Sequence, residues 1–478
     1  MADLKDKNRR PLPDPLLDVV KVEQARSSDE IIKEDTSGMA NTGSPPAGRT
    51  TLEEARRRGP LGFLSVLGPG LITGASDDDP SGIGTYSQVG SQFGYGLLWT
   101  ALFTFPLMAA VQELCARIAL QTGVGLGVSL RRKFPRPLVG VCVLALFIAN
   151  TINIGADLGA IAAGGSILTR GWLQQSWLVI PAGLVILGLM FFATYATIFK
   201  IFKWLTLVLF AYVITGFIVH PPLREVVVAT LIPHLEFNKD FVTALVAVLG
   251  TTISPYLFFW QASSEVEEKR AAGKVTESQR RGAEDRELKA ARTDILIGML
   301  FSNVVMYFII MVSAAVLHAH GKTNIQSATE AASALVPIAG PFAFVLFAVG
   351  LIVTGLLAIP ILSGSAAYAL KEFLNLPGTL AAKPRYRPTF YAILGLAVVA
   401  GIGMNFLHID PIKALLYSAA INGLVAGPLL VLIVLLGSDR KYMESRVSGV
   451  LSKSLTWLTA ALMLLAGAAL IVTSYVIH

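Results

Sequence analysis

The sequence predicts an all-α integral membrane protein in which two of the helices are broken midway, and three observations support this. The chain of 478 residues is 54% hydrophobic and only 15% charged, with a mean hydropathy of +0.62. Apolar runs of about 20 residues, enough to cross roughly 30 Å of hydrocarbon, recur along it. Two of these runs are interrupted by proline, glycine and polar residues, which a continuous helix does not tolerate well.

Eleven apolar runs are long enough to span a membrane, and the first and sixth of them are broken. They lie at 61–93, 96–122, 137–165, 176–197, 201–220, 241–270, 293–318, 338–370, 387–407, 412–437 and 454–477. Breaks at the first and sixth positions predict two five-helix halves, 59–220 and 240–437, related as inverted repeats. The expected fold is therefore a LeuT-type 5+5 inverted repeat with 11 transmembrane helices, in which 454–477 is an additional span.

Charge in the loops predicts the orientation. Lysine and arginine concentrate in alternate loops, such as 131–136, 269–292 and 440–453, which are expected to be cytoplasmic. The N-terminus is then cytoplasmic, the C-terminus is extracytoplasmic, and the expected location is the plasma (inner) membrane. Residues 1–58 are polar and charged, and are expected to form a disordered cytoplasmic arm. The loop 265–294 mixes acids and bases at helical spacing, which indicates a solvated extension of the sixth helix.

Composition also excludes several classes of function. The net charge of +7 does not indicate nucleic-acid binding, because the basic residues are divided among short loops. Cys115 and Cys142 fall within apolar runs, so neither a disulfide framework nor a thiolate metal site is expected. No nucleophile arrangement or phosphate-binding loop occurs, which predicts a protein that is not an enzyme and needs no cofactor. No obligate protein partner is evident, and the expected surroundings are the lipid bilayer.

The two breaks predict a cation site. The first runs from Gly68 to Gly82 and contains three consecutive aspartates, and the second is Leu249-Gly-Thr-Thr-Ile-Ser-Pro-Tyr256. Carboxylates at bilayer depth normally face a water-filled cavity, an ion or a partner. Unwound backbone at that depth lines a cavity, and a pair of broken helices in the two halves marks a transporter's substrate site. Free carbonyls and a carboxylate together favour a cation.

The same segments resemble the Nramp family of divalent-metal transporters over roughly residues 60–437. The family's Asp-Pro-Gly-Asn is matched by Asp79-Pro80-Ser81-Gly82, and its Met-Pro-His by Ser254-Pro255-Tyr256. Gln261 stands where the family has a second histidine in the sixth helix. Ala160 stands where many members have a glutamate in the third span. These departures resemble the Nramp-related magnesium transporters, a branch without the metal-ligand methionine.

The resemblance implies a ligand set for the transported ion. Asp79 is its anionic ligand, direct or through water, unless Asp79 serves only as a helix cap. The main-chain carbonyls of Ser76 and Thr251 join it, and Ser254 and Tyr256 line the pocket, although Tyr256 is equally consistent with packing. Gly82 in place of asparagine opens volume. Without a soft sulfur donor, this set favours a partly hydrated Mg²⁺, with Mn²⁺ also carried.

Other polar residues within the apolar runs are weaker candidates. Asp157 is flanked by two asparagines at helical spacing, and it contacts either the hydrated ion or a neighbouring polar side chain. Asn422 is expected to reach the site from the tenth span. Asp77 and Asp78 either add negative potential that concentrates cations or face an aqueous vestibule.

Two further groups of residues are given a structural role. Glu113 and Arg117, four residues apart, are expected to form an ion pair on one helix face. The histidines at span ends and outer loops lack metal-ligand spacing and are expected to be surface residues: His220, His234, His318, His320 and His408.

The predicted function is transport of divalent metal cations, mainly Mg²⁺, by alternating access and without coupling to protons. One alternative is a proton-coupled Mn²⁺ or Fe²⁺ importer. It needs a titratable path, which tyrosine, glutamine and alanine at positions 256, 261 and 160 do not offer. A more distant alternative is an organic-solute symporter with the same architecture. Three aspartates in the first break would repel the substrate carboxylate that such proteins hold there.

Overall fold

The structure is a computed structural model that describes residues 69–192, 209–236, 238–325, 331–332, 343–376, 378–380, 384–407 and 411–476. Helices make up most of this part of the chain, and no strand occurs in it. The predicted N-terminal arm, 1–58, and His408 lie outside the described residues.

Nine segments of the described chain are long and apolar enough to cross a membrane. They belong to α6 (Trp99–Thr122), α8 (Arg136–Leu168), α9 (Gln175–Phe192), α13 and α14 (Lys239–Thr252 and Pro255–Ala271), α16 (Asp285–Val316), α19 (Ala343–Leu374), α20 (Pro388–Met404), α21 (Pro411–Gly437) and α23 (Val450–Val476). The other two expected spans, 61–93 and 201–220, extend into residues outside the described ranges. Their described parts are α4 (Pro69–Asp77), α5 (Pro80–Phe93) and α11 (Phe210–Ile218), so the count of eleven stays a prediction.

Both predicted helix breaks are confirmed. The first helix stops at Asp77 and resumes at Pro80, and the sixth stops at Thr252 and resumes at Pro255. In each case proline is the first residue of the second half-helix, where its missing N–H costs nothing. The residue before each proline is forced toward extended backbone, as the ψ angles of 172° at Asp79 and 126° at Ser254 show.

The broken helices are held between unbroken ones. The helix α16 packs against α4 and α5, and α21 packs against α13 and α5. Gly74 of α4 meets the backbone of Gly298 in α16, where an added Cβ would lie 2.1 Å from the Gly298 carbonyl oxygen. Gly250 of α13 meets α21 in the same way, 2.0 Å from the Ala419 carbonyl oxygen. Only glycine permits these close crossings, which fix the two breaks against neighbouring helices.

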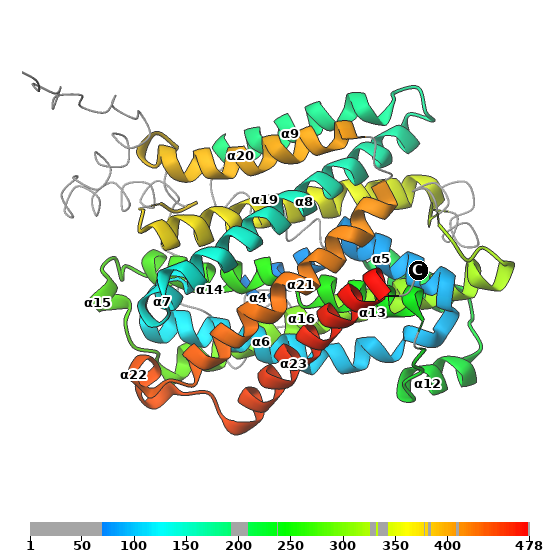
Figure 1. Cartoon of the computed structure of the whole chain (residues 1–478). Coiled ribbons are helices and arrows are strands. Elements are labelled where there is room, and N and C mark those ends of the chain that lie inside the picture. The colour runs from blue at the N-terminus through cyan, green and yellow to red at the C-terminus, as the bar shows by residue number, and fades with distance from the viewer. Residues whose placement is uncertain are drawn as a thin grey trace, which may run out of the picture.

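The arrangement of polarity is that of a membrane protein. In Figure 1, α9 and α20 flank one side of the bundle next to α8, and α23 lies on the other side. Large apolar side chains on these outer helices are exposed, for example Val141, Leu184, Val399 and Leu465. The aspartates of the first break are buried instead. A bundle with apolar side chains on its outside and polar side chains in its interior is typical of a protein in a lipid bilayer.

Short helices close the two ends of the bundle. We call the end at α7 (Leu126–Lys133), α15 (Glu277–Arg280) and α22 (Arg440–Met443) the basic end (Figure 1). Ion pairs from Arg132 to Glu277 and from Lys133 to Asp439 join these three elements. The remaining short elements are α12 (Leu223–Leu231), η2 (Gly94–Leu97), η4 (His318–His320), η7 (Pro384–Tyr386), η8 (Asn405–Leu407) and η9 (Glu444–Arg446).

The loop after the sixth helix corrects one prediction. The helix does continue past Gln261, but it ends at Ala271, and the segment that follows is not a solvated helical extension. Instead the loop folds back onto the bundle, and Lys269 is buried. Its ammonium group donates to the carbonyls of Leu120, Arg280 and Gly282, which hold the loop against the end of α6.

Three smaller predictions are confirmed. Glu113 and Arg117 form an ion pair on one face of α6. Both cysteines are buried, as expected of residues within apolar runs. The four histidines within the described ranges are exposed, and they bond to backbone carbonyls or to Glu236.

Candidate metal centre

Asp79 lies at the centre of the first break and has two roles in the fold. Its Oδ1 accepts the backbone N–H of Gly82 at 2.8 Å and the hydroxyl of Ser81 at 2.5 Å, which makes it the N-cap of α5. Its Oδ2 accepts the side-chain amide of Asn153 from α8 at 3.3 Å. Asp79 therefore does cap α5, but it is also buried and contacts α8, so capping is not its only role.

The main-chain carbonyls of Ser76 and Thr251 lie in the two breaks, as expected. The Ser76 carbonyl accepts the hydroxyl of Tyr256 at 2.8 Å, and the Thr251 carbonyl accepts the hydroxyl of Ser254 at 2.7 Å. A carbonyl oxygen has two lone pairs, so each of them can accept one further donor or cation. Tyr256 therefore ties the two broken helices together, while the Ser254 hydroxyl turns toward its own helix.

Hydroxyl groups also join the breaks to each other. The Ser81 and Thr251 hydroxyls lie 3.4 Å apart, one on each broken helix. Below them, Thr73 of α4 donates to the Gln261 side chain at 2.8 Å, and Gln261 in turn donates to Glu265 at 2.8 Å. The half-helices α4 and α14 are thus linked by the neutral side chains of Thr73 and Gln261. Gln261 stands where the family that the sequence resembles has histidine.

Asp157 on α8 faces the same region. It is fully buried, and neither of its carboxylate oxygens makes a hydrogen bond of good geometry, although the backbone N–H of Ser81 is near; Asp79 is the charged group that it interacts with. Asn153, one helical turn earlier on α8, contacts Asp79 directly. The structure thus brings Asp157 to the first break, on the side of α8.

Asp77 and Asp78 meet a different helix. The hydroxyl of Ser302 on α16 lies 2.9 Å from Asp77 Oδ2 and 3.3 Å from Asp78 Oδ1. Both aspartates are completely buried, which excludes the expected alternative of an aqueous vestibule in this conformation. The four aspartates therefore occupy the two sides of the first break, next to α16 and next to α8.

In the described part of the chain, acidic side chains gather in this region without basic ones. Asp77, Asp78, Asp79 and Asp157 are all buried, and among the described residues no lysine or arginine contributes to the electrostatic environment of any of them. Buried charges of one sign are costly unless something of opposite charge accompanies them. All the nearby donors are oxygen atoms, the ligands that hard divalent cations prefer.

Gly82 does not open empty space. A Cβ at this position would lie 3.2 Å from Cε2 of Tyr86, 3.3 Å from the Asp77 carbonyl oxygen and 3.5 Å from Thr251 Oγ1. The aromatic ring of Tyr86, one turn further along α5, takes up the volume that the missing side chain leaves. The expectation of a roomier pocket at Gly82 is therefore wrong in this structure, because a tyrosine fills the gap.

Asn422 on α21 is fully buried and neither of its side-chain polar atoms has a hydrogen-bond partner. Its neighbour Gly423 packs on Gly250 of α13, just before Thr251. This places Asn422 near the second break, but its side chain makes no hydrogen bond with another of the expected ligands.

Four contributors had no role assigned from the sequence: Ser81, Tyr86, Asn153 and Ser302. Asn153 carries a readable signal, because it precedes Asp157 by one helical turn and shares its face. Tyr86 carries a weaker signal of the same kind, because it follows Gly82 by four residues on the same helix. Ser302 carries none, since it is an ordinary residue of an apolar helix until the fold brings it to the aspartates.

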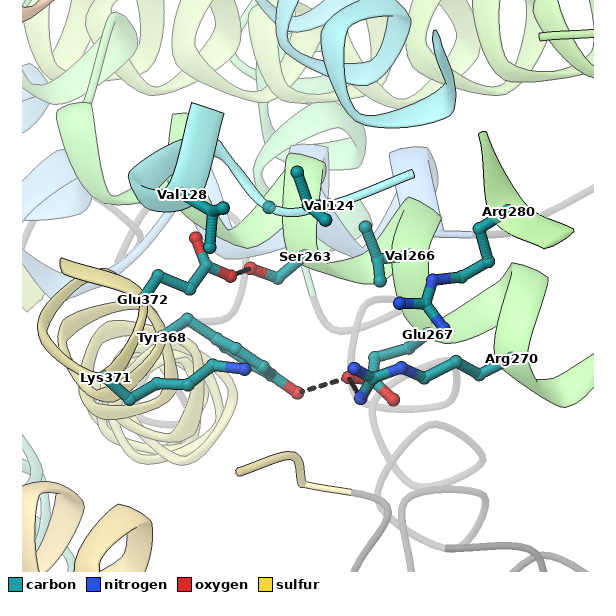
Figure 2. Close-up of a pocket in the computed structure, with 11 residues that line it drawn as sticks. Val124, Val128, Ser263, Val266, Glu267, Arg270, Arg280, Tyr368, Lys371 and Glu372 are labelled. Atoms are coloured by element: carbon teal, nitrogen blue, oxygen red, sulfur yellow. Dashed lines mark hydrogen bonds and ion pairs between the residues drawn. The ribbon is translucent and has the colours of Figure 1, made fainter. Parts of the chain in front are cut away.

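A separate cavity of about 70 Å³ lies at the basic end, between α14, α19 and the segment before α7 (Figure 2). Three basic and two acidic side chains line it: Arg270, Arg280, Lys371, Glu267 and Glu372. One oxygen of Glu267 is without a protein partner, and the cavity has room for water beside it. With a positive balance of charge, this cavity is a poor cation site compared with the helix breaks.

Known proteins are similar to this chain over most of its length. The family described as "Natural resistance-associated macrophage protein-like" (Nramp) matches residues 70–473. The divalent metal cation transporter MntH of Bacillus subtilis (strain 168) is 24% identical over 425 residues, which cover 88% of this chain and 95% of MntH. MntH of Deinococcus radiodurans is 28% identical over 314 residues, covering 65% and 69% of the two chains.

Solved structures show the fold. The crystal structure of the Eremococcus coleocola manganese transporter, in complex with an aromatic bis-isothiourea substituted compound, matches with a TM-score of 0.68 at 16% identity, covering 91% of this chain and 92% of that one. Mhp1, a nucleobase-cation-symport-1 family transporter, matches with a TM-score of 0.53 at 18% identity, covering 85% and 91%. The LeuT-type all-α fold that the two broken helices predicted is thereby confirmed.

Proposed function

The chain belongs to the Nramp family, and from this premise we propose that it is a multi-pass membrane transporter for divalent metal cations rather than an enzyme. The observation that carries the proposal is the group of four buried aspartates at the first helix break, with no basic side chain beside them in the described chain. The named relatives MntH are divalent metal cation transporters, which agrees with it.

We further propose that Mg²⁺ is the main substrate and that Mn²⁺ passes as well. Ser254, where the family has methionine, offers a hydroxyl in place of a sulfur, and the groups around Asp79 are carboxylates, amides, hydroxyls and carbonyls. Hard oxygen donors suit Mg²⁺, which keeps part of its water shell, and discriminate little between it and Mn²⁺. Asp79 and Asp157, with the carbonyls of Ser76 and Thr251, would hold the ion.

Transport without proton coupling is the third part of the proposal. Tyr256 and Gln261 replace the family's histidines and are occupied by hydrogen bonds to the carbonyl of Ser76 and to Glu265. Neither side chain changes charge near neutral pH, so neither offers the titratable step that histidine provides. An inside-negative membrane potential would then favour entry by roughly 4.6 kcal/mol per 100 mV for two charges. The experiment must distinguish uncoupled transport from the alternative, a proton-coupled importer of Mn²⁺ or Fe²⁺.

The proposed setting is the plasma (inner) membrane with a cytoplasmic N-terminus and an extracytoplasmic C-terminus. Basic residues in α7, α15 and α22 support it, because such residues favour the cytoplasmic side. On this orientation the basic end faces the cytoplasm.

The experiment compares Asp79→Asn with Asp79→Ala in liposomes. Asparagine keeps a carbonyl oxygen that caps α5 but removes the charge, whereas alanine removes both. If Asp79 is the anionic ligand, both variants lose transport of Mg²⁺ and Mn²⁺, and only Asp79→Ala also loses about 0.5–2 kcal/mol of stability. Ion flux is measured per folded molecule, with Ca²⁺ for comparison and a pH dye inside the vesicles. Asp240→Asn, at an exposed aspartate in the first turn of α13, is the control.

Three outcomes would count against the proposal. Normal flux in Asp79→Asn would make the residue a cap only. Saturable Mn²⁺ uptake that millimolar Mg²⁺ leaves untouched would contradict the oxygen-only selectivity. Acidification of the vesicle lumen in proportion to Mg²⁺ flux would establish proton coupling.

A further inference from the structure

Asp77 and Asp78 compete for a single hydrogen-bond donor. The Ser302 hydroxyl lies within reach of one oxygen of each, at 2.9 and 3.3 Å, but it has only one proton to donate. The remaining oxygens, Asp77 Oδ1 and Asp78 Oδ2, are buried and have no hydrogen-bond partner. Buried polar groups in native proteins are nearly always satisfied, so these oxygens call for a ligand.

Tyr86 supplies an independent indication of the same ligand. Its side chain is 0% exposed and its hydroxyl, although near Thr251, makes no hydrogen bond of good geometry. A Cβ on Gly82 would lie 3.2 Å from the Tyr86 ring and 3.3 Å from the Asp77 carbonyl oxygen, so the ring is close to the backbone of Asp77. A buried phenol without a hydrogen-bond partner, close to Asp77, is suited to the same ligand as the two carboxylates.

The balance of charge points to a cation. Four carboxylates lie buried around the first break, and one divalent ion would offset only two of them. Asp79 faces Asn153 and Asp157 on α8, whereas Asp77 and Asp78 face Ser302 on α16. The carboxylates thus divide into two pairs, one with contacts to α8 and one with contacts to α16, and each pair, when ionised, matches the charge of one divalent ion.

We propose that Asp77, Asp78, Ser302 and Tyr86 form a second divalent-cation site beside the one at Asp79 and Asp157, so that the protein holds two ions at once. The inference rests on the proposed transport function and extends it. All its donors are oxygen atoms, so the second ion is of the same hard class, Mg²⁺ or Mn²⁺, with water completing its coordination.

The test is the number of Mn²⁺ ions bound by the purified full-length protein in detergent. Unbound Mn²⁺ has a strong electron paramagnetic resonance signal, and its loss during a titration counts the bound ions. The wild-type chain is expected to bind two, with a spectrum broadened by the magnetic interaction of two neighbouring ions. The double variant Asp77→Asn/Asp78→Asn is expected to bind one, with the broadening gone.

Milder variants guard against misfolding of that double variant. Ser302→Ala and Tyr86→Phe each remove one proposed contact and are expected to weaken the second ion about tenfold without changing the first. Tyr212→Phe on α11 is the control for Tyr86, because its hydroxyl is also buried and unpartnered but only burial, and no aspartate, acts on it. Ser363→Ala on α19 is the control for Ser302, since its hydroxyl bonds its own helix backbone.

The outcomes separate this inference from the function on which it rests. A wild-type count of one Mn²⁺, unchanged in the double variant, would overturn the second site and leave transport at the first standing. A count of two that persists in the double variant would also overturn it. No binding of Mn²⁺ and none of Mg²⁺ in competition would overturn the proposed function itself.

Discussion

Among the described residues, buried charged side chains gather in two regions, which differ in whether those side chains have partners of opposite charge. At the basic end, the buried charges are matched by partners from several helices. At the first helix break, the buried aspartates have no opposite charge among the described residues. A buried charge that is fully bonded stabilises architecture, whereas one that is left unpaired is costly and is retained for a ligand.

Glu372 shows how the basic end is satisfied. Its carboxylate, carried by α19, accepts the backbone N–H groups of Gly127, at 2.8 Å, and Val128, and so caps the N-terminus of α7 from another part of the chain. The Ser263 hydroxyl lies 3.5 Å away on its other side (Figure 2). Gly125 makes this possible, because a Cβ there would lie 1.9 Å from Glu372 Oε1.

The largest difference between the two kinds of buried charge is expected when an unpaired acid and a paired acid are each neutralised. Asp157→Asn should lower metal flux per folded molecule at least tenfold, because it removes a charge from the buried group around the ion. Glu113→Gln, which removes the charge of an acid paired with Arg117 on α6, should leave that flux within about twofold. The measurement is Mg²⁺ uptake into liposomes. Equal losses in both variants would mean that pairing does not distinguish function from architecture.

The reverse pattern is expected for Glu372→Ala. Losing the cap of α7 should lower the free energy of unfolding by about 1–3 kcal/mol, while flux per folded molecule is retained. Gly125→Ala should act through the same contact by displacing the carboxylate, so the double variant should lose less stability than the sum of the two single changes. Thermal denaturation in detergent measures all three. Full additivity would show that Gly125 and Glu372 act separately.

Tyr256→Phe tests whether a neutral group at the breaks belongs to packing or to the ion. Removing the bond to the Ser76 carbonyl should cost about 1 kcal/mol of stability. If the hydroxyl only links the half-helices, the apparent affinity for Mg²⁺ should change by less than about threefold. The concentration dependence of uptake is the measurement, and a much larger loss of affinity would make Tyr256 a ligand.

The smallest effect is expected at the exposed surface of the basic end. Hydrogen bonds from Arg132, at 2.6 and 2.9 Å, hold the pKa of Glu277 below its ordinary value of 4.5. The pair therefore stabilises the folded state above that value, and its contribution disappears as the pH falls through the lowered pKa. Because both side chains are more than two-fifths exposed, the contribution is under about 1 kcal/mol. Glu277→Gln should lower the melting temperature slightly at neutral pH and not at about pH 3; an equal difference at both would contradict an electrostatic origin.

The sequence predicts more of the fold than of the site. Proline after a polar, glycine-containing run is enough to predict where the first and sixth helices break, because the missing N–H and the restricted preceding residue are local effects. The end of the sixth helix at Ala271 also has a local cause, because Gly273 has a φ of 87° and the N–H of Lys274 bonds the Lys269 carbonyl, as at helix ends closed by glycine. The fold of the loop that follows was not predictable in this way, since the Lys269 side chain reaches the carbonyl of Leu120, 149 residues away.

The sequence by itself determined a helical membrane protein with three consecutive aspartates in the first of two helix breaks and a further acid, Asp157, in the third span. Its hydrophobic runs and helix-breaking residues act locally, so their consequences can be read in order along the chain. The tertiary structure decided which groups share a site. Ser302 is 225 residues from Asp77, and the hydroxyls of Ser81 and Thr251, 3.4 Å apart, come from different broken helices. Such contacts depend on helix packing, which no short stretch of sequence specifies.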